Sequence, residues 1–227
     1  MAFVSYQTHI KPYATGRDTL TIESLVNFEA AVDQLFEYFQ QQGTPNLLEE
    51  YCPYFAAIWP AARGLAAHLA SEQAKFLSGK TVLELGCGLG LPSLVASKCG
   101  ARRVVATDMH PDCEEFLRRN CERNDIPPVE FVMVDWRQQD LNLGKFDYVI
   151  ASDVLYDRQH APSLAAFVAR HIMPDGHVII SDQGRPYLQD FVTSMQDLGF
   201  KSETLIEPVI DADPIREVFV LKFVRLL

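Results

Sequence analysis

The sequence predicts an α/β fold, a Rossmann-like, seven-stranded, mostly parallel sheet with helices on both faces and a C-terminal antiparallel hairpin. Three observations support this prediction. Short apolar runs alternate with stretches of helical spacing from residue 81 onward. The early apolar runs are nearly continuous, as in parallel strands covered on both faces. The last two strand-like runs are joined only by Glu207 to Pro214, too few residues for a helical crossover.

The expected elements follow in order along this part of the chain. Parallel strands are predicted at 81–85, 103–107, 129–134, 147–152 and 176–182, and the hairpin strands at 201–206 and 216–224. Helices are predicted at 91–99, 111–123, 161–172 and 186–198.

The residues before this alternation are expected to form a separate part of the protein. Residues 1–55 are expected to form an N-terminal extension of short strands and a helix, and residues 56–227 the main domain. β-branched residues around the turn Gly16-Arg17-Asp18 indicate one or two strands. Ser24 is the expected cap of a helix from about Leu25 to Gln42, and Pro60 the expected first residue of another.

Three glycines, Gly86, Gly88 and Gly90, follow the strand at 81–85 and precede a helix. A strand, a glycine turn and a helix form the nucleotide-binding corner of doubly wound folds, because glycines let the backbone approach a ligand closely. The free N–H groups at the start of the helix face that ligand. Glu84 stands just before the turn. An acid there repels a pyrophosphate, but it can hold hydroxyl groups or offset a cation.

An acid follows each of the first five strands, and the carboxyl ends of those strands are where doubly wound folds bind ligands. Besides Glu84 these acids are Asp108, Asp135, Asp153 and Asp182. Asp108 lies about 20 residues beyond the glycine turn, where dinucleotide folds bind ribose hydroxyls. The glycine spacing differs from Gly-x-Gly-x-x-Gly, which disfavours a dinucleotide. A nucleoside with a sulfonium and an amino-acid tail suits the acids better, with Asp135 at the adenine amino group and Trp136 over the ring.

As a set, the glycine motif, Asp108, Val134-Asp135-Trp136 and Pro174-Asp175-Gly176 resemble the motifs of class I S-adenosylmethionine-dependent methyltransferases over residues 55 to 225. Ile58-Trp59-Pro60-Ala61-Ala62 and Asp153-Val154-Leu155-Tyr156 resemble methyltransferase family 16, which includes many protein-lysine methyltransferases. The resemblance implies that Trp59 touches the cofactor and that Asp153 and Tyr156 border the methyl-acceptor channel. The residues expected to bind S-adenosyl-L-methionine are Trp59, Glu84, Gly86, Cys87, Gly88, Gly90, Asp108, Met109, Asp135, Trp136 and Ser152.

The expected function is an S-adenosylmethionine-dependent N-methyltransferase of a protein lysine. Asp153 would attract the ammonium, and Tyr156 would align it by a hydrogen bond or a cation–π contact. Alternatively, Asp153 caps a turn and Tyr156 packs on the sheet. A small-molecule acceptor and a non-catalytic cofactor-binding protein stay open as alternatives, and an NAD-dependent oxidoreductase is more distant. The N-terminal extension is expected on the substrate side or as a lid.

Composition and short motifs restrict the classes of partner that the protein is expected to bind. A net charge of −10 disfavours non-specific nucleic-acid binding, and the Asp-Pro-Pro-Tyr motif of amino-methylating nucleic-acid enzymes is absent after the fourth strand. The five cysteines include no Cys-x-x-Cys pair, which predicts reduced thiols in a cytoplasmic protein. Neither a signal peptide nor an apolar run of about 18 residues is present, so no membrane partner is expected. His110 is a weak candidate for the cofactor rim. His160, His171 and His177 lack metal-site spacing, and no metal is expected.

Overall fold

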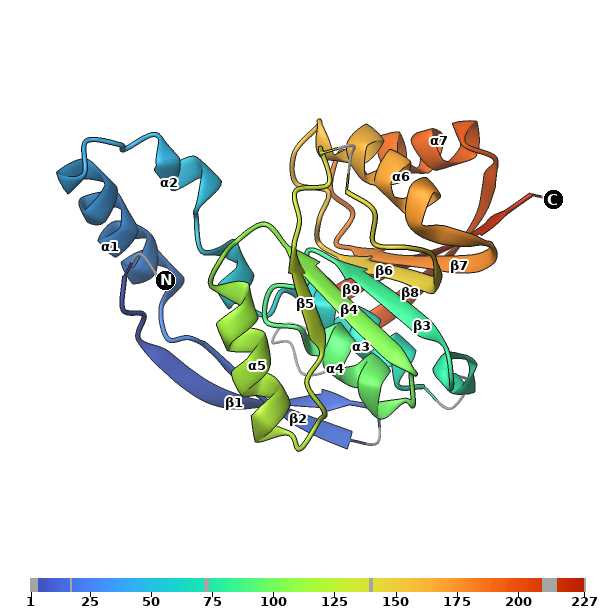
Figure 1. The fold of residues 1–227 in the computed structure, drawn as a ribbon, viewed down its shortest axis with the longest axis horizontal. Coiled ribbons are helices and arrows are strands. Elements are labelled where there is room, and N and C mark those ends of the chain that lie inside the picture. The colour runs from blue at the N-terminus through green and yellow to red at the C-terminus, as the bar shows by residue number, and fades with distance from the viewer. Residues whose placement is uncertain (1–3, 17, 72–73, 139–140, 210–215, 227) are drawn as a thin grey trace.

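A seven-stranded sheet forms the centre of the protein in the computed structural model, which describes residues 4–16, 18–71, 74–138, 141–209 and 216–226 (Figure 1). The strand order is β5-β4-β3-β6-β7-β9-β8. The bounds are β3 (Thr81–Leu85), β4 (Arg103–Asp108), β5 (Glu130–Met133), β6 (Phe146–Ser152), β7 (Ile172–Asp182), β8 (Phe200–Val209) and β9 (Arg216–Arg225). β9 pairs antiparallel with both β7 and β8, and the other described strand pairs of this sheet are parallel, so the predicted fold class and its closing hairpin are confirmed.

Helices cover both faces of the sheet, as the alternation predicted. α3 (Pro60–Leu69), α4 (Leu91–Lys98) and α5 (Cys113–Arg123) share one core with Val82, Val104 and Ile150 of the strands. α6 (His160–His171) and α7 (Leu188–Asp197) share a second core with Leu83, Val105 and Val149. Because adjacent strand residues contribute to opposite cores, these strands are buried on both sides, which explains their continuous apolar runs.

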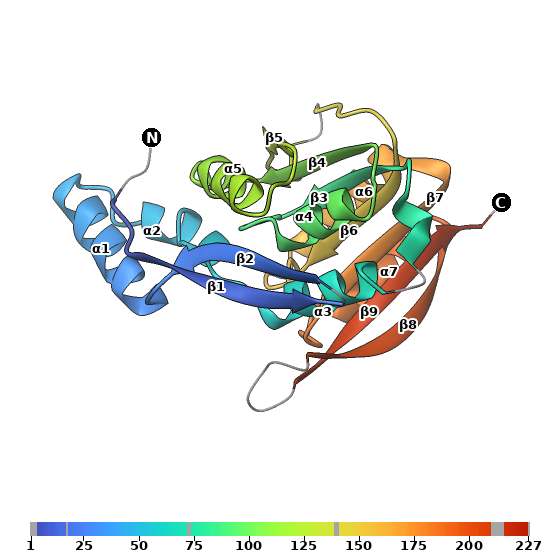
Figure 2. The same ribbon diagram turned by 90° about the horizontal axis from the view of Figure 1, so that it is seen from below.

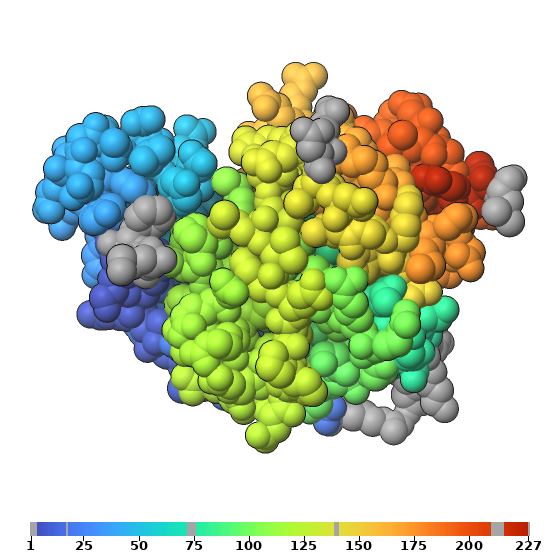
Figure 3. Space-filling model, in the orientation of Figure 1, coloured from blue at the N-terminus to red at the C-terminus, as the bar shows by residue number. Residues whose placement is uncertain are grey.

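The N-terminal extension forms a separate two-stranded sheet followed by short helices. β1 (Thr8–Thr15) and β2 (Asp18–Leu25) pair antiparallel, and α1 (Phe28–Gln41) and α2 (Leu47–Glu50) follow. These two helices project from the body as a lobe at the left of Figures 1 and 3. A 3₁₀ turn at Tyr54–Ala56 leads to α3, and another lies at Ala74–Leu77.

The predicted start of the first helix is wrong. Ser24 lies within β2, where its hydroxyl contacts His9 Nε2 at 3.1 Å, because pairing with β1 extends the strand to Leu25. The helix begins three residues later than expected. Asn27 is its cap, and its Oδ1 accepts the N–H of Ala30 at 3.1 Å.

Helix α5 anchors the N-terminal β1–β2 hairpin to the main domain (Figure 2). The side chain of Asn124 accepts the N–H of Thr21 at 2.7 Å and donates to the carbonyl of Thr21 at 2.9 Å, so it pairs with β2 as a neighbouring strand would. Asn120 Oδ1 accepts the N–H of Glu23 at 2.8 Å. Arg119 and Arg123 both bind the Glu23 carboxylate, at 3.0 and 2.8 Å. The extension therefore has a fixed position beside the sheet.

Candidate functional site

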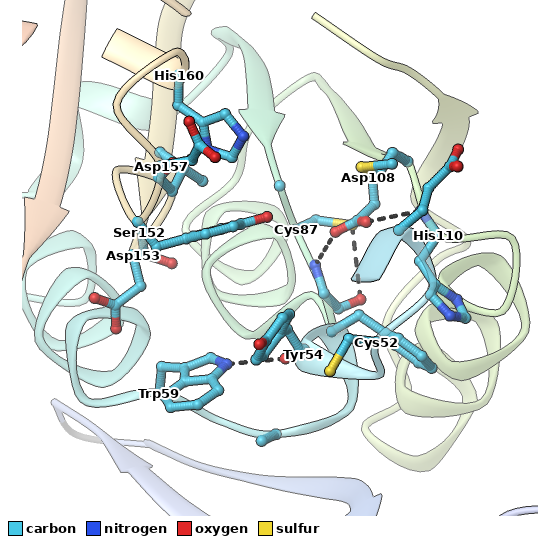
Figure 4. A pocket seen from close by; sticks show the side chains of 18 of the residues that line it. Cys52, Tyr54, Trp59, Cys87, Asp108, His110, Ser152, Asp153, Asp157 and His160 are labelled. Atoms are coloured by element: carbon cyan, nitrogen blue, oxygen red, sulfur yellow. Dashed lines mark hydrogen bonds between the residues drawn. The ribbon is translucent and has the colours of Figure 1, made fainter. Parts of the chain in front are cut away.

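A cavity of about 980 Å³ lies at the carboxyl ends of β3, β4 and β6 (Figure 4). Most of the predicted site residues line it: Trp59, Gly86, Cys87, Gly88, Asp108, Met109, Asp135, Trp136, Ser152, Asp153 and Tyr156. Glu84 and Gly90 do not. The lobe contributes Val32, Leu48, Glu49 and Glu50 to the wall. The structure thus brings the strand-end residues and the extension together around one space.

The glycine turn is held in place by packing as well as shaped for a ligand. Gly88 has a φ of 51°, and a Cβ there would lie 2.8 Å from the Phe55 carbonyl oxygen. Gly90 has a φ of 81°, and its Cβ would lie 2.2 Å from Leu117 Cδ1. Both positions therefore require glycine whether or not a ligand is bound. The close approach of Phe55 also shows that the segment after the lobe packs directly on the turn.

Glu84 is fully buried and caps helix α4 from below the cavity. Its Oε2 accepts the backbone N–H of Ser93 at 3.0 Å and also the Ser93 hydroxyl. Burial raises the pKa of Glu84 to about 8, against the opposing effect of these Ser93 hydrogen bonds. Because this carboxyl already occupies an N–H group at the start of α4, and Pro92 has none, little remains there for a phosphate to bind.

Asp108 is preorganised by the backbone on both of its oxygens. Oδ2 accepts the N–H of Gly88 at 2.9 Å, and Oδ1 accepts the N–H of His110 at 3.0 Å. Burial raises the pKa of Asp108, while these hydrogen bonds oppose the rise. The Cys113 thiol and the Met109 N–H also act on this carboxylate as hydrogen-bond donors. A ligand hydroxyl would therefore bind the acceptor positions that these four donors leave.

His110 lines the cavity as a buried, neutral histidine. Its ring stacks on Phe55 with centroids 4.2 Å apart. Nδ1 accepts the N–H of Asp112 at 3.2 Å, so Nε2 carries the proton and donates it to the Tyr51 carbonyl at 3.3 Å. Burial lowers the pKa of His110 to about 4. The ring therefore joins the wall of the cavity to the segment that follows α2.

Asp135 and Trp136 stand side by side at the end of β5. The Asp135 carboxylate binds Arg137, with Nε at 2.8 Å, and this contact lowers the pKa of Asp135. The Trp136 ring meets the edge of His160 at a centroid distance of 5.4 Å. His160 Nδ1 lies 2.9 Å from the Val154 carbonyl, which can only accept, so Nδ1 carries a proton.

Asp153 is buried and already holds several partners. Its backbone has a φ of 57°, and its Oδ1 pairs with Arg185 Nε at 3.2 Å. Oδ2 accepts the side-chain amide of Gln183 at 2.8 Å and the N–H of Ala61, in the first turn of α3, at 3.4 Å. The carboxylate thus complements the positive end of α3 and the charge of Arg185. Whether it also attracts an acceptor stays a prediction.

Tyr156 keeps a side chain that is 46% exposed in the cavity mouth. Burial of the hydroxyl and the charge of Asp108 raise the pKa of Tyr156 to about 12, so it is a neutral phenol near pH 7. The Arg185 guanidinium lies 5.9 Å from its ring centroid, and the His160 ring is 4.7 Å away in an edge-on arrangement. Tyr54 approaches from the extension, with centroids 5.9 Å apart.

Sequence reasoning did not single out Tyr54 or Arg185 and set His160 aside. Arg185 follows β7 and meets Asp153 after β6, two strands that are neighbours in the sheet. The signal in the sequence that could have identified Arg185 is a basic residue a few positions beyond the last parallel strand. Among the described residues, no group of three or more His, Cys, Asp or Glu side chains is arranged to hold a metal. No helix in the described ranges is long and apolar enough to cross a membrane.

The chain matches known proteins across this site. Its residues 52–197 match the profile of the lysine methyltransferase family. It is 31% identical over 157 residues to the electron transfer flavoprotein beta subunit lysine methyltransferase of Mus musculus, covering 69% of this chain and 60% of that protein. It is 32% identical over 148 residues to the Mus musculus histone-arginine methyltransferase METTL23, covering 60% of this chain and 58% of the relative.

The chain spans about three-fifths of the length of these curated relatives. Among solved structures, the ribosomal protein L11 methylase from Lactobacillus delbrueckii subsp. bulgaricus superposes with a TM-score of 0.59 at 22% identity. The match covers 75% of this chain and 81% of that one, and it bears on the fold alone. Because the family profile covers well over half of the sequence and includes the cavity residues at the strand ends, the chain belongs to the lysine methyltransferase family.

Proposed function

We propose that the protein is an S-adenosylmethionine-dependent N-methyltransferase that modifies lysine side chains of a protein. The supporting observation is the convergence of the glycine turn, Asp108, Asp135-Trp136 and Tyr156 on one cavity in a chain of this family. Methyl transfer from a sulfonium needs positioning and exclusion of water more than proton chemistry.

The donor set fits this cofactor. Asp108 is fixed by two backbone N–H groups and lines the cavity, where its carboxylate can accept ribose hydroxyls. Asp135 and Trp136 offer an acceptor and an aromatic face for the adenine. Glu84 occupies the start of α4, which disfavours a pyrophosphate and suits a cofactor that carries none. Trp59, Cys87, Met109 and Ser152 complete the wall.

When bound, S-adenosylmethionine supplies an electrophilic methyl group on a positively charged sulfur. The residues of the chain must present a neutral amine to it, and deprotonating lysine costs about 5 kcal/mol at pH 7. Removal of the amine from water lowers that cost. Tyr156, as a neutral phenol, can accept or donate a hydrogen bond to the amine. Asp153, paired with Arg185, holds α3 and the end of β7 around the acceptor side.

The extension belongs to the acceptor side in this proposal. α1 and α2 contribute Val32, Leu48, Glu49 and Glu50 to the cavity wall. A lid in that position shapes the path of the acceptor without contributing to the glycine turn.

Calorimetric titration with S-adenosylmethionine tests the cofactor assignment. Asp108→Asn should weaken binding by at least about 10-fold, because it removes the charge from the hydroxyl-binding group. Asp147→Asn is the matched control, since Asp147 binds Thr81 at the opposite end of the strands and lies outside the cavity. Equal affinities in wild type and Asp108→Asn, with native circular dichroism, would contradict the assignment.

Transfer of a tritiated methyl group into lysate proteins, followed by amino-acid analysis, tests the acceptor. We expect the label on lysine. Label on arginine would redirect the proposal toward the chemistry named for METTL23. Label confined to small molecules would overturn the protein acceptor. Cofactor binding without transfer to any fraction would leave a binding protein instead of an enzyme.

A further inference from the structure

The acceptor side of the cavity carries a pair of exposed tyrosines from different parts of the chain. Tyr54 is 47% exposed and belongs to the segment between the lobe and α3, whereas Tyr156 is 46% exposed and follows β6. Both rings line the cavity. Leaving two large aromatic rings half exposed forgoes burial energy, which is a common mark of a binding surface.

The two rings form a corner that suits a cation. Their centroids are 5.9 Å apart with an interplanar angle of 42°. One cation can therefore lie within about 6 Å of both centroids, which is the range of a cation–π contact. Trp59 stands 6.4 Å from Tyr54 at an angle of 50°, so its ring forms a third side.

Neighbouring side chains fix this corner and leave it open to the cavity. Phe28, at the start of α1, stacks on Tyr54 at 5.6 Å and 26°, covering one face of that ring. The Arg185 guanidinium lies over a face of Tyr156 at 5.9 Å. The Trp59 Nε1 group donates to the Tyr54 backbone carbonyl at 2.9 Å, which holds the two residues together independently of the Tyr54 ring (Figure 4). Phe28 thus supports Tyr54, and Arg185 with the edge-on His160 ring supports Tyr156, while the two tyrosines stay 47% and 46% exposed.

The charges around the corner favour a cation as well. Glu49, Glu50 and Asp157 line the same cavity, and within the described part of the chain none of the three is in an ion pair. Asp153, by contrast, is already in an ion pair with Arg185. A cation entering the corner therefore meets aromatic faces and carboxylates that are outside ion pairs, although Glu50 also attracts Arg137 and Asp157 accepts the N–H of Gln159 at 2.7 Å. Asp153, which Arg185 already holds, is not free to receive the cation.

We propose that Tyr54 is a specificity-determining residue, which forms with Tyr156 and Trp59 an aromatic corner that selects the ammonium end of an acceptor lysine. This inference rests on the proposed lysine methylation and names the residue that recognises the acceptor. Tyr54 comes from the segment that follows the extension's helices, so recognition of the acceptor draws on a part of the chain outside the strand ends.

Ligand titrations with n-butylammonium, the free end of a lysine side chain, test the corner without a known acceptor. Binding is followed by NMR of ring-labelled tyrosines, with and without S-adenosylhomocysteine. Its neutral counterpart, 1-butanol, has the same number of heavy atoms. Wild type and Tyr54→Phe should bind the ammonium in preference to the alcohol, because both keep the ring. Tyr54→Leu should weaken ammonium binding by about 10-fold and leave alcohol binding nearly unchanged.

Phe36→Leu is the matched control, since Phe36 is 44% exposed on α1 but does not line the cavity. Equal binding of ammonium and alcohol, or equal ammonium binding by wild type and Tyr54→Leu, would overturn the inference even if lysine methylation is found. Failure of S-adenosylhomocysteine to bind in calorimetry would instead overturn the proposed function. In that case the ammonium titration of the free protein still decides the role of Tyr54.

Discussion

At the scale of single residues, the acidic side chains of this site differ in their surroundings and therefore in their roles. Glu84 is buried against Ser93 and supports a helix. Asp108 is held by two backbone N–H groups and faces the cavity. Asp153 is neutralised by Arg185. Residues of the same type at equivalent strand ends therefore have separate roles, because each role depends on the donors that the neighbouring elements bring.

The buried carboxyl of Glu84 predicts a pH dependence of stability. Its folded-state pKa of about 8 lies above the unfolded value of 4.5, so the folded protein holds a proton that the unfolded chain releases between these values. The resulting stabilisation is complete below pH 4.5 and is lost as the pH rises through 8. Relative to Glu84→Gln, which keeps an acceptor for Ser93 without titrating, wild type should lose up to about 1.4 kcal/mol per pH unit in this window.

Urea unfolding of both proteins at several pH values between 4.5 and 8 measures this difference. A constant gap between the two free energies of unfolding would show that Glu84 is ionised in the folded protein.

At the scale of elements, the strand, turn and helix around the glycines are fixed by close packing. Gly90 and Gly43 have similar left-handed backbones, with φ of 81° and 72°. A Cβ at Gly43 meets nothing within 4 Å, whereas one at Gly90 lies 2.2 Å from Leu117 Cδ1. Gly43→Ala should therefore cost only the backbone strain, about 1–2 kcal/mol. Gly90→Ala should add about 1–3 kcal/mol for the overpacked core.

Thermal unfolding of both variants compares the two costs. Similar melting temperatures would mean that α5 moves aside freely and that the turn is not fixed by packing.

The elements also show how much of the fold the sequence predicts. The strands and helices after residue 81 were predicted to within a few residues, since local periodicity reports burial on two faces. The start of α1 was predicted wrongly because Leu25 pairs with Thr8 of β1, and a contact with another strand cannot be inferred from the local sequence. Most of the predicted site residues line the cavity, because strand ends converge by topology. Tyr54 and Arg185 were not predicted, since their contacts are with neighbours distant in sequence.

At the scale of the whole molecule, the N-terminal extension and the main domain share one core. Leu20 and Ile22 of β2 are fully buried in the same cluster as Leu117 of α5. Ile22→Ala should therefore lower the free energy of unfolding of the entire chain by about 2–5 kcal/mol in a single transition. Val26→Ala, at a position 52% exposed, should change it by less than about 0.5 kcal/mol.

Chemical denaturation followed by circular dichroism and by tryptophan emission checks this prediction. Two separate transitions, with only the first sensitive to Ile22→Ala, would show that the extension unfolds on its own.

The positions of Trp59 and Trp136 provide a built-in optical probe. They are the two tryptophans of the chain, and both line the cavity. Tryptophan emission therefore originates entirely from the site, Trp59 at the start of α3 and Trp136 after β5. With Trp59→Phe and Trp136→Phe, the remaining signal reports one wall at a time. Unlabelled protein can then show whether the cofactor and the acceptor enter independently or in a fixed order.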